Sequence, residues 1–388
     1  MKYKLKNIFD LQMGKTPSRN NTNYWNTNDY EWISIADLSK TEKYITDTKE
    51  YLSTLAIEES GIKVIPANTV VMSFKLSIGK TAITGKDMYC NEAIMAFHDK
   101  HVVDILPEYI YYMFKYRNWD NGSNKAVMGK TLNKSTLSEV EIDICSIEKQ
   151  KEIVTVLDKV MESLSSRKKE LALFDELVRG RFVELFGNPV LNDKGWRCNL
   201  LGEITLKIGS GATPKGGREA YREEGIALIR SMNVYNGKFE YKDLAHISDE
   251  QAAKLDNVSV KKSDVLLNIT GASVARSCIV PNQILPARVN QHVCIVRCKK
   301  CIEPVFLNGL LVDDNYQNLL WEIAGSGATR EAITKQQVEH LKIIVPPIEL
   351  QNEFADFVKQ IDKSKLIVQK ELDETQLLFD SLMQEYFG

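Results

Sequence analysis

The sequence lacks long apolar runs and a strong charge of either sign. No stretch comes near the ~18 apolar residues that a membrane span needs, and the start, MKYKLKNIFD, has no apolar core or cleavage site of the secretory kind. The net charge of −2 differs from that of a dedicated non-specific nucleic-acid binder, although basic loops can still share one face. With 44% hydrophobic and 26% charged residues among 388, we expect a globular cytoplasmic protein of two or three domains.

Cysteine is scarce, scattered and odd in number, with seven residues, which suits reduced thiols better than a disulfide framework. One cluster has the composition of a zinc site: His292, Cys294, Cys298 and Cys301 in QHVCIVRCKKC. However, HVCIVRC has the pattern of a strand, on which residues two apart lie roughly 7 Å apart. Ligands of one ion lie about 2.0–2.3 Å from it, so we favour core thiols and expect no metal.

Gly-Lys-Thr, the end of a phosphate-binding loop, occurs three times, ending at Thr16, Thr81 and Thr131. Such a loop also needs a glycine five positions before the second glycine, because its backbone N–H groups surround the phosphates. Those positions hold Phe9, Phe74 and Asn124. None of the three tripeptides is therefore predicted to bind a nucleotide.

The chain is instead a tandem repeat. Gly-x-Thr-Pro occurs at Gly14–Pro17 and at Gly211–Pro214, and YCNEAIMAF matches RVNQHVCIV. VMGKTLNKSTLSEVEI matches GSGATREAITKQQVEHLKI, so Gly-Lys-Thr at 129–131 corresponds to Gly-Ala-Thr. The offset between copies drifts from 197 at the Thr-Pro turn to 201 at Gln150 and Gln351, and then stays constant to the end of each copy.

The ungapped part of each copy predicts a rigid element of fixed length. Each stretch has apolar positions spaced alternately four and three apart, with no proline, which is typical of a coiled-coil helix. At 1.5 Å per residue each helix is roughly 55–60 Å long, and we expect the two to pair antiparallel. The predicted seam is Ile153, Leu157, Val160, Leu164, Leu171, Phe174, Val178, Leu185, Phe354, Val358, Ile361, Val368, Leu372, Phe379, Leu382 and Tyr386. Four polar residues interrupt it, Arg167, Arg181, Lys365 and Thr375, and either fix the register or lie in solvent where a globule ends.

The remaining sequence predicts two mixed α+β globules, each with a small, partly antiparallel sheet. Strand patterns occur at 69–74, 264–269, EAIMAF and HVCIVR, and helical patterns at 107–116 and 304–323. The predicted organisation is a globule at 1–146, a helix at 147–187, a linker at 188–199, a second globule at 200–346 and a second helix at 347–388.

Basic and polar residues gather at the turns of both globules, with glycine and serine that allow close approach of the backbone. Such side chains suit phosphate oxygens and base edges. The candidate DNA-binding residues are Lys15, Thr16, Arg19, Lys75, Lys80, Lys130, Lys134, Thr213, Lys215, Arg218, Arg230, Asn233, Arg276 and Arg330.

The order and duplication of these motifs resemble the DNA-specificity subunit of a Type I restriction–modification system over essentially the whole chain. The motifs are the two Gly-x-Thr-Pro turns, Asn290-Gln291, Gly-x-Thr before a strand, and VPPIELQ leading into a long helix. The first copy departs from the pattern with NEA in place of Asn-Gln and with CSIEKQ in place of the Pro-Pro lead-in.

The resemblance implies two target-recognition domains, each reading one half of a bipartite double-stranded DNA sequence. The paired helices would space them and dock two adenine methyltransferase subunits and the restriction–translocase subunits. No catalytic residue or cofactor of its own is expected, because the only Pro-Pro, at 346–347, lacks the polar leader and aromatic of an amino-methyltransferase motif. Two other functions stay open on the residues alone: a coiled-coil adaptor with two protein-binding globules, and a self-contained DNA-modifying enzyme.

Overall fold

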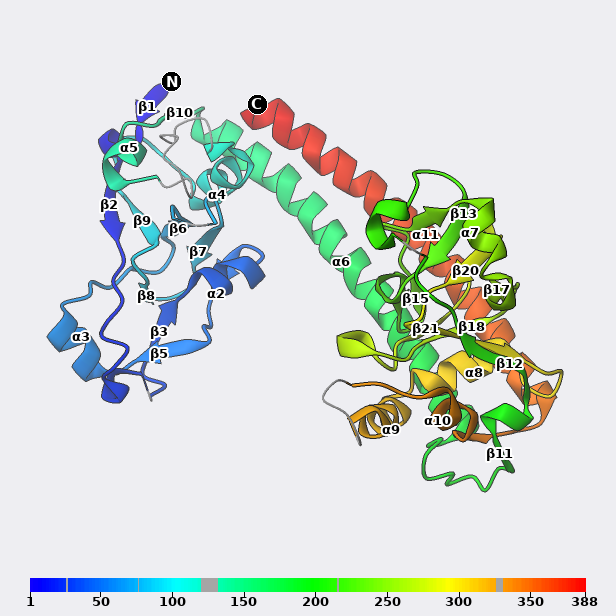
Figure 1. Ribbon diagram of the computed structural model, residues 1–388. Coiled ribbons are helices and arrows are strands. Elements are labelled where there is room, and N and C mark those ends of the chain that lie inside the picture. Colours follow the sequence, from blue (N-terminus) through cyan, green and yellow to red (C-terminus); the bar gives the residue numbers. More distant parts are fainter. Residues whose placement is uncertain (26, 76, 120–131, 215, 326–330) are drawn as a thin grey trace. The chain divides into compact units, whose positions relative to one another are not determined.

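The computed structural model describes residues 1–25, 27–75, 77–119, 132–214, 216–325 and 331–388 (Figure 1). Contacts between residues divide the chain into two units. The first unit is discontinuous and joins Met1–Arg167 to Glu371–Gly388, whereas the second is Lys168–Lys370. In the described ranges, no helix combines the length and apolar character needed to cross a lipid bilayer.

The first unit contains a five-stranded sheet of order β2-β9-β6-β7-β4 and a three-stranded sheet of order β5-β3-β8. The pairs β4–β7 and β3–β8 are parallel and the others are antiparallel. The strands are β2 (Phe9–Met13), β3 (Tyr30–Ile33), β4 (Tyr44–Ile45), β5 (Glu50–Leu52), β6 (Val70–Ser73), β7 (Thr81–Thr84), β8 (Tyr89–Cys90) and β9 (Ile94–Asp99).

Helices pack on the five-stranded sheet. The longest of the short helices is α4, in which the six consecutive residues from Tyr109 to Phe114 are buried. The helices of this part of the chain are α1 (Leu5–Ile8), α2 (Ile35–Lys40), α3 (Thr54–Ser60), α4 (Pro107–Tyr116), α5 (Lys134–Ser138) and α6 (Ile147–Phe186). Proline begins α4, where its missing N–H costs no helical hydrogen bond.

The second unit repeats this plan with sheets of order β12-β21-β18-β19 and β16-β13-β20-β17. Only the pair β13–β20 is parallel among their described strand pairs. The strands, with the separate hairpin β14–β15, are β12 (Thr205–Ser210), β13 (Ile226–Ile229), β14 (Val234–Tyr235), β15 (Lys238–Phe239), β16 (Ala245–Ile247), β17 (Ser259–Val260), β18 (Val265–Asn268), β19 (Ser277–Ile279), β20 (Ala287–Val289) and β21 (Val293–Cys298).

The helical pattern predicted over 304–323 forms two helices rather than one. These two helices are α8 (Pro304–Leu311) and α9 (Asp314–Gly325). The other helices that follow β16 are α7 (Asp249–Ala253), α10 (Lys335–Glu339) and α11 (Ile348–Phe387). The break has a local cause, because the carboxylate of Asp313 accepts hydrogen bonds from the N–H groups of Asn315 and Tyr316 at 3.0 and 3.2 Å. Asp313 therefore caps a new helix instead of continuing the first.

In each unit the first strand pairs with the strand that precedes the long helix. β1 (Lys2–Lys4) pairs antiparallel with β10 (Glu141–Asp143), and β11 (Cys198–Leu200) pairs antiparallel with β22 (Lys342–Ile344). Both pairs tie the start of a globule to its end. The mixed α+β fold and the tandem repeat predicted from the sequence are thus confirmed.

A buried glutamine fastens the first turn of each long helix to its globule. Gln150 accepts from the N–H of Leu106 at 2.9 Å and donates to the carbonyl oxygens of Asp104 and Cys145 at 2.9 and 3.0 Å. Gln351 makes the same three kinds of bond, to Glu303, Cys301 and Pro346. Neither side chain is exposed to solvent, so the constant offset of 201 between them marks a shared structural role.

The long helices α6 and α11, each of 40 residues, pair antiparallel. In the first unit Arg167 forms an ion pair with Glu371, and Phe379 and Met383 of α11 join the core that contains Leu157 of α6.

In the second unit Lys365 pairs with Asp175 at 2.5 Å, and Arg181 pairs with Glu353 at 2.6 Å. Of the four polar interruptions, three thus make interhelical ion pairs. The hydroxyl of Thr375 donates to the Glu371 carbonyl of its own helix.

Candidate nucleic-acid interface

The Gly-x-Thr-Pro turn of each unit packs directly against the turn that carries the asparagine motif. A Cβ atom on Gly14 would lie 2.2 Å from the carbonyl oxygen of Asn91, and one on Gly211 would lie 1.8 Å from the carbonyl oxygen of Val289. Only glycine allows backbones to approach this closely. The two motifs, far apart along the chain, therefore form one structural feature in each unit.

The asparagine of each motif shapes its own turn. The side-chain oxygen of Asn91 accepts from the N–H of Ala93 at 3.0 Å, and that of Asn290 accepts from the N–H of His292 at 3.0 Å. Asparagine is common in turns for this reason. The first copy keeps this asparagine, and the residue that follows it is the one that differs.

The residue that follows the asparagine contacts the threonine of the Gly-x-Thr-Pro turn. The hydroxyl of Thr16 donates to the carboxylate of Glu92, and the hydroxyl of Thr213 donates to the carboxamide oxygen of Gln291. Glu92 and Gln291 are both exposed. Each unit thus presents a polar pair at the surface, acidic in the first unit and neutral in the second.

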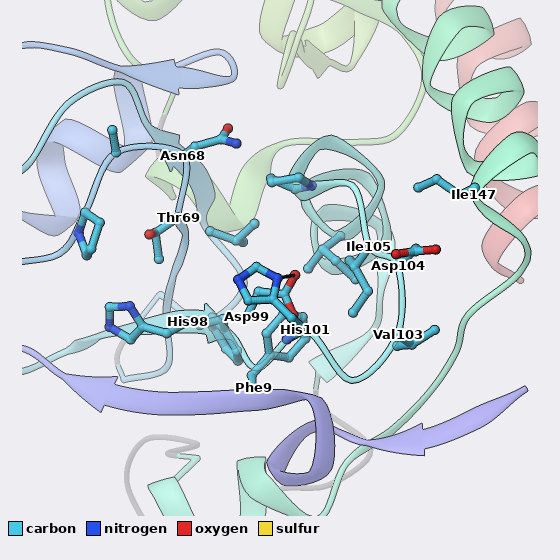
Figure 2. Close-up of a pocket in the computed structure, with 16 residues that line it drawn as sticks. Phe9, Asn68, Thr69, His98, Asp99, His101, Val103, Asp104, Ile105 and Ile147 are labelled. Atoms are coloured by element: carbon cyan, nitrogen blue, oxygen red, sulfur yellow. Dashed lines mark hydrogen bonds and ion pairs between the residues drawn. The ribbon is translucent and has the colours of Figure 1, made fainter.

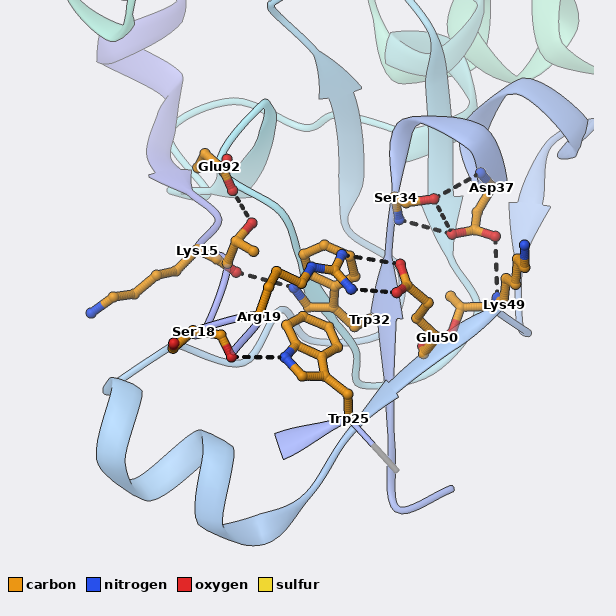
Figure 3. A network of polar contacts seen from close by, with 12 residues as sticks. Lys15, Ser18, Arg19, Trp25, Trp32, Ser34, Asp37, Lys49, Glu50 and Glu92 are labelled. Carbon is orange, nitrogen blue, oxygen red and sulfur yellow. Dashed lines mark hydrogen bonds and ion pairs between the residues drawn. The ribbon is translucent and has the colours of Figure 1, made fainter. Parts of the chain in front are cut away.

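Arg19, which is on the same loop as Thr16, lies against the rings of Trp25 and Trp32 (Figure 3). Its guanidinium carbon is 3.8 Å from the ring centroid of Trp25 and 4.8 Å from that of Trp32, and its two terminal nitrogens bond to the carboxylate of Glu50. The indole N–H groups of both tryptophans donate to backbone carbonyls of the loop. Stacking and a two-pronged ion pair therefore hold the guanidinium in one orientation.

The structure places the predicted lysines of the first unit on three segments. Lys15 follows Gly14 in the turn and donates to the carbonyl oxygen of Ser60. Lys75 and Lys80 lie between β6 and β7, with the ammonium of Lys75 5.2 Å from the ring centroid of Phe74. Lys134 begins α5 and is exposed.

Two predicted arginines of the second unit also stack on tyrosines. Arg276 lies 4.5 Å from the ring centroid of Tyr235, and Arg230 lies 5.2 Å from that of Tyr221. Arg230 also donates to the carbonyl oxygen of Asp243. Sequence reasoning did not include the aromatic partners, although basic residues interleaved with Trp and Tyr are a recognisable signal of stacking surfaces.

Asn233 is fully buried, unlike those predicted cations whose side chains the structure describes. Its amide nitrogen donates to the carbonyl oxygens of Glu240 and Lys242 at 2.9 and 3.3 Å, and its oxygen accepts from the N–H of Arg230 at 3.0 Å. The side chain organises the loop that carries Arg230. Lys130, Lys215 and Arg330 lie outside the described residues, as does the side chain of Arg218.

All predicted seam residues of α6 and α11 are at least partly buried. The more deeply buried members are Ile153, Leu157, Leu164, Phe354, Ile361, Val368 and Phe379. The half-buried members are Val160, Leu171, Phe174, Val178, Leu185, Val358, Leu372, Leu382 and Tyr386.

Sequence reasoning missed two large core residues near the end of α6. Phe182 and Phe186 are 3% and 0% exposed and pack against Phe306 of α8 and Phe354 of α11. The predicted seam position there was Arg181. The buried face turns away from a strict heptad because α6 packs on the globule as well as on α11, and because 3.6 residues per turn drift against a seven-residue repeat.

A protein-family model and several known proteins match most of the chain. The family model "Type I restriction modification DNA specificity domain" matches residues 1–173 and 194–376. The specificity subunit of the Type I restriction enzyme MjaIX from Methanocaldococcus jannaschii is 26% identical over 404 residues, covering 98% of this chain and 90% of that protein. The EcoBI specificity subunit of Escherichia coli is 24% identical over 292 residues, covering 68% and 60%.

Solved structures share the fold. The Type I restriction–modification S subunit from M. genitalium superposes with a TM-score of 0.59 at 16% identity, covering 100% of this chain and 96% of that one. A chain from a study of complex assembly and conformational transition of the Type I system gives 0.60 at 18% identity, covering 100% and 97%. With the matched model spanning both repeats, the chain belongs to the Type I restriction–modification DNA-specificity family.

Proposed function

We propose that each repeat reads one half of a bipartite DNA target, and that α6 and α11 set the gap between the halves. The observation that carries the proposal is the duplication of one surface feature. In both units an exposed polar residue bonds to the threonine of a Gly-x-Thr-Pro turn, with basic residues within a few positions along the chain. A duplicated reader on one polypeptide suits duplex DNA, whose twofold presents half-sites about one turn, roughly 34–36 Å, apart.

The proposed boundaries follow the sequence repeat. The recognition domains are residues 1–146 and 200–346, and the spacer helices are 147–187 and 347–388. A linker at 188–199 joins the first spacer helix to the second recognition domain.

Stacked arginines such as Arg19, Arg230 and Arg276 are suited to guanine edges and phosphates, because the planar guanidinium offers paired donors in fixed geometry. Exposed lysines such as Lys15 and Lys134 suit phosphate contacts that position the duplex without reading it.

Chemistry belongs to other subunits. Specificity subunits of this family are not catalytic, and methylation and cleavage are carried out by their partners. We assign S-adenosylmethionine and ATP to those partners, and place the protein with the host DNA in the cytoplasm.

The long helices also offer apolar surface for a partner helix. Leu173 and Leu177, four residues apart on one face of α6, are 60% and 50% exposed. On α11, Leu366 and Ile367 are 72% and 61% exposed. We propose that such positions dock two methyltransferase subunits, because large apolar side chains exposed on a helix indicate an interface.

Exchange of residues 1–146 for the matching segment of a relative with a different target tests the proposal. Methylated sites are then mapped in a host that supplies the methyltransferase. We expect one half of the methylated sequence to change and the other half and the gap to stay the same. A change in both halves would contradict modular reading, and methylation without sequence preference would identify an adaptor instead.

A further inference from the structure

The residue that follows the motif asparagine differs in charge between the two units. It is Glu92 in the first and Gln291 in the second, and each lies two positions before the first residue of β9 or β21. The two positions are equivalent, because β9 pairs with β6 in the same register as β21 pairs with β18. The other end of β9, with His98 and Asp99, lines a pocket of about 530 Å³ (Figure 2), so that pocket is separate from the turn that carries Glu92.

Both positions adjoin cations of the candidate interface. Glu92 accepts from the hydroxyl of Thr16, which is on the same loop as Arg19 (Figure 3). In the second unit, the residue before Gln291 donates its N–H at 3.0 Å to the carbonyl oxygen of the residue before Arg230. A duplex bound by these arginines would therefore come close to Glu92 and to Gln291.

Two neighbours orient the carboxamide of Gln291. The hydroxyl of Thr213 donates to its oxygen, and its nitrogen lies 3.1 Å from Nε2 of His292. Because an amide nitrogen can only donate, Nε2 accepts, and the N–H of the neutral ring lies on Nδ1, facing the hydroxyl of Thr270. Among the residues that the structure describes, this leaves the carboxamide one N–H and one oxygen lone pair for a ligand.

The carboxylate of Glu92 offers acceptors only. Ala93 stands where the second unit has His292, and within the described ranges the Glu92 side chain bonds to Thr16 alone, through Oε2. A carboxylate cannot donate to a phosphate oxygen, whose negative charge repels it. In the major groove guanine presents acceptors and thymine an acceptor and a methyl group, whereas cytosine presents an amino group. A DNA contact of Glu92 would therefore be to a base amino group.

We propose that Gln291 reads an adenine in one half-site and that Glu92 reads a cytosine at the equivalent place in the other. Gln291 would accept from adenine N6 and donate to adenine N7, and Glu92 would accept from cytosine N4. Cytosine suits Glu92 better than adenine does, because adenine N7 would face the second carboxylate oxygen. This assignment rests on the proposed reading of one half-site by each repeat.

Selection of bound duplexes from a random pool tests the assignment. The chain is assembled with its methyltransferase subunits, and the retained DNA is sequenced, so that the readout does not depend on methyl transfer. We expect Glu92→Gln to replace one cytosine of one half-site by adenine, and Gln291→Glu to replace one adenine of the other half-site by cytosine. Both side chains are exposed and both replacements are close in shape, so the variants should fold. A half-site that stays the same in its variant would overturn the assignment of that residue.

Removal of one base atom separates reading from a structural role of Gln291. 7-Deazaadenine lacks N7 but keeps N6 and its base pairing. Placed at the adenine that Gln291→Glu no longer selects, it should weaken binding of the natural chain about fivefold, because one hydrogen bond is lost. Binding of Gln291→Ala should not change, as measured by fluorescence anisotropy. Equal weakening of both proteins, or of neither, would show that Gln291 does not contact this base.

Failure of the proposed function would look different. If the natural chain in its complex selects no bipartite sequence, the reading of half-sites by the two repeats is wrong, and the base assignment is wrong with it. A clear bipartite sequence that neither variant alters would leave modular reading intact and overturn only the roles of Glu92 and Gln291.

Discussion

At the scale of single residues, the candidate interface shows cations held by aromatic rings. Arg19, Arg230 and Arg276 each lie over a Trp or Tyr ring, and such contacts contribute about 0.5–1 kcal/mol each at exposed sites. Stacking also reduces the conformational entropy that a long side chain loses when it binds. Glu50 adds a constraint at Arg19, because its carboxylate occupies the donors that a phosphate or guanine would use.

Replacing Glu50→Gln should therefore release Arg19 for phosphate. We expect several-fold tighter binding to duplexes of random sequence, with the slope of log affinity against log salt steeper by about one. Fluorescence anisotropy over a range of NaCl concentrations measures both quantities. Glu50→Gln/Arg19→Ala is the matched control and should lose the steeper slope, and a slope that stays equally steep in this double variant would remove Arg19 from the interface.

Substitution by alanine should destabilise the protein at Gly211 but have little effect at Gly209, two residues away. At Gly211 a Cβ atom would collide with the backbone of Val289, whereas at Gly209 nothing lies within 4 Å. We expect Gly211→Ala to lower the free energy of unfolding by about 2–3 kcal/mol and Gly209→Ala to change it by less than about 0.5 kcal/mol. Urea-unfolding midpoints give the comparison, and equal midpoints would argue against the close packing of the two turns.

At the scale of elements, each long helix is fixed to a globule at its first turn. Gln150 and Gln351 satisfy three backbone groups each within a buried site. Buried backbone groups that lose their partners are costly, so the glutamines define where each helix leaves its globule. Ion pairs along the helices, such as Lys365 with Asp175, are partly exposed and contribute at most about 1 kcal/mol each.

Gln150→Ala and Gln351→Ala form a matched pair that should damage different units. Each substitution should cost roughly 2–3 kcal/mol, because it leaves buried backbone groups without partners. Hydrogen exchange followed by mass spectrometry should show faster exchange in the first unit for Gln150→Ala and in the second for Gln351→Ala. Equal effects of both variants on both units would mean that the glutamines do not act locally.

Much of this organisation could be predicted from the sequence, because it depends on periodicity and repetition. The long helices, several strands and the repeat follow from patterns that local physics determines. The ion pair of Arg19 with Glu50 and the burial of Asn233 could not be predicted, because they depend on which loops meet in space. The break at Asp313 was missed because its capping role competes with an otherwise continuous helical pattern.

At the scale of the whole molecule, the repeats and the helices are proposed to set the gap in the DNA target. The sequence Lys-Glu recurs at Lys169-Glu170 and Lys370-Glu371, at the repeat offset of 201, close to the unit boundaries at 167–168 and 370–371 along the chain. These positions are matched places at which both helices can be lengthened without disturbing either globule.

Insertion of seven residues after Lys169 and after Lys370 should widen the gap between half-sites by about three base pairs. Seven helical residues add about 10 Å, and each base pair occupies about 3.4 Å of duplex. Mapping methylated sites in a host with the partner subunits measures the gap. Insertion in only one helix should abolish methylation, because it breaks the pairing, and an unchanged gap after the double insertion would mean that the helices do not set it.

The discontinuity of the first unit has a consequence for biosynthesis. Phe379 and Met383 belong to the core of the unit that begins at Met1. On the ribosome, residues 1–167 must therefore wait for Phe379 and Met383 to be synthesised before their core is complete. A stop codon in place of codon 379 would damage the first unit and spare the second, although the second is translated later than residues 1–167.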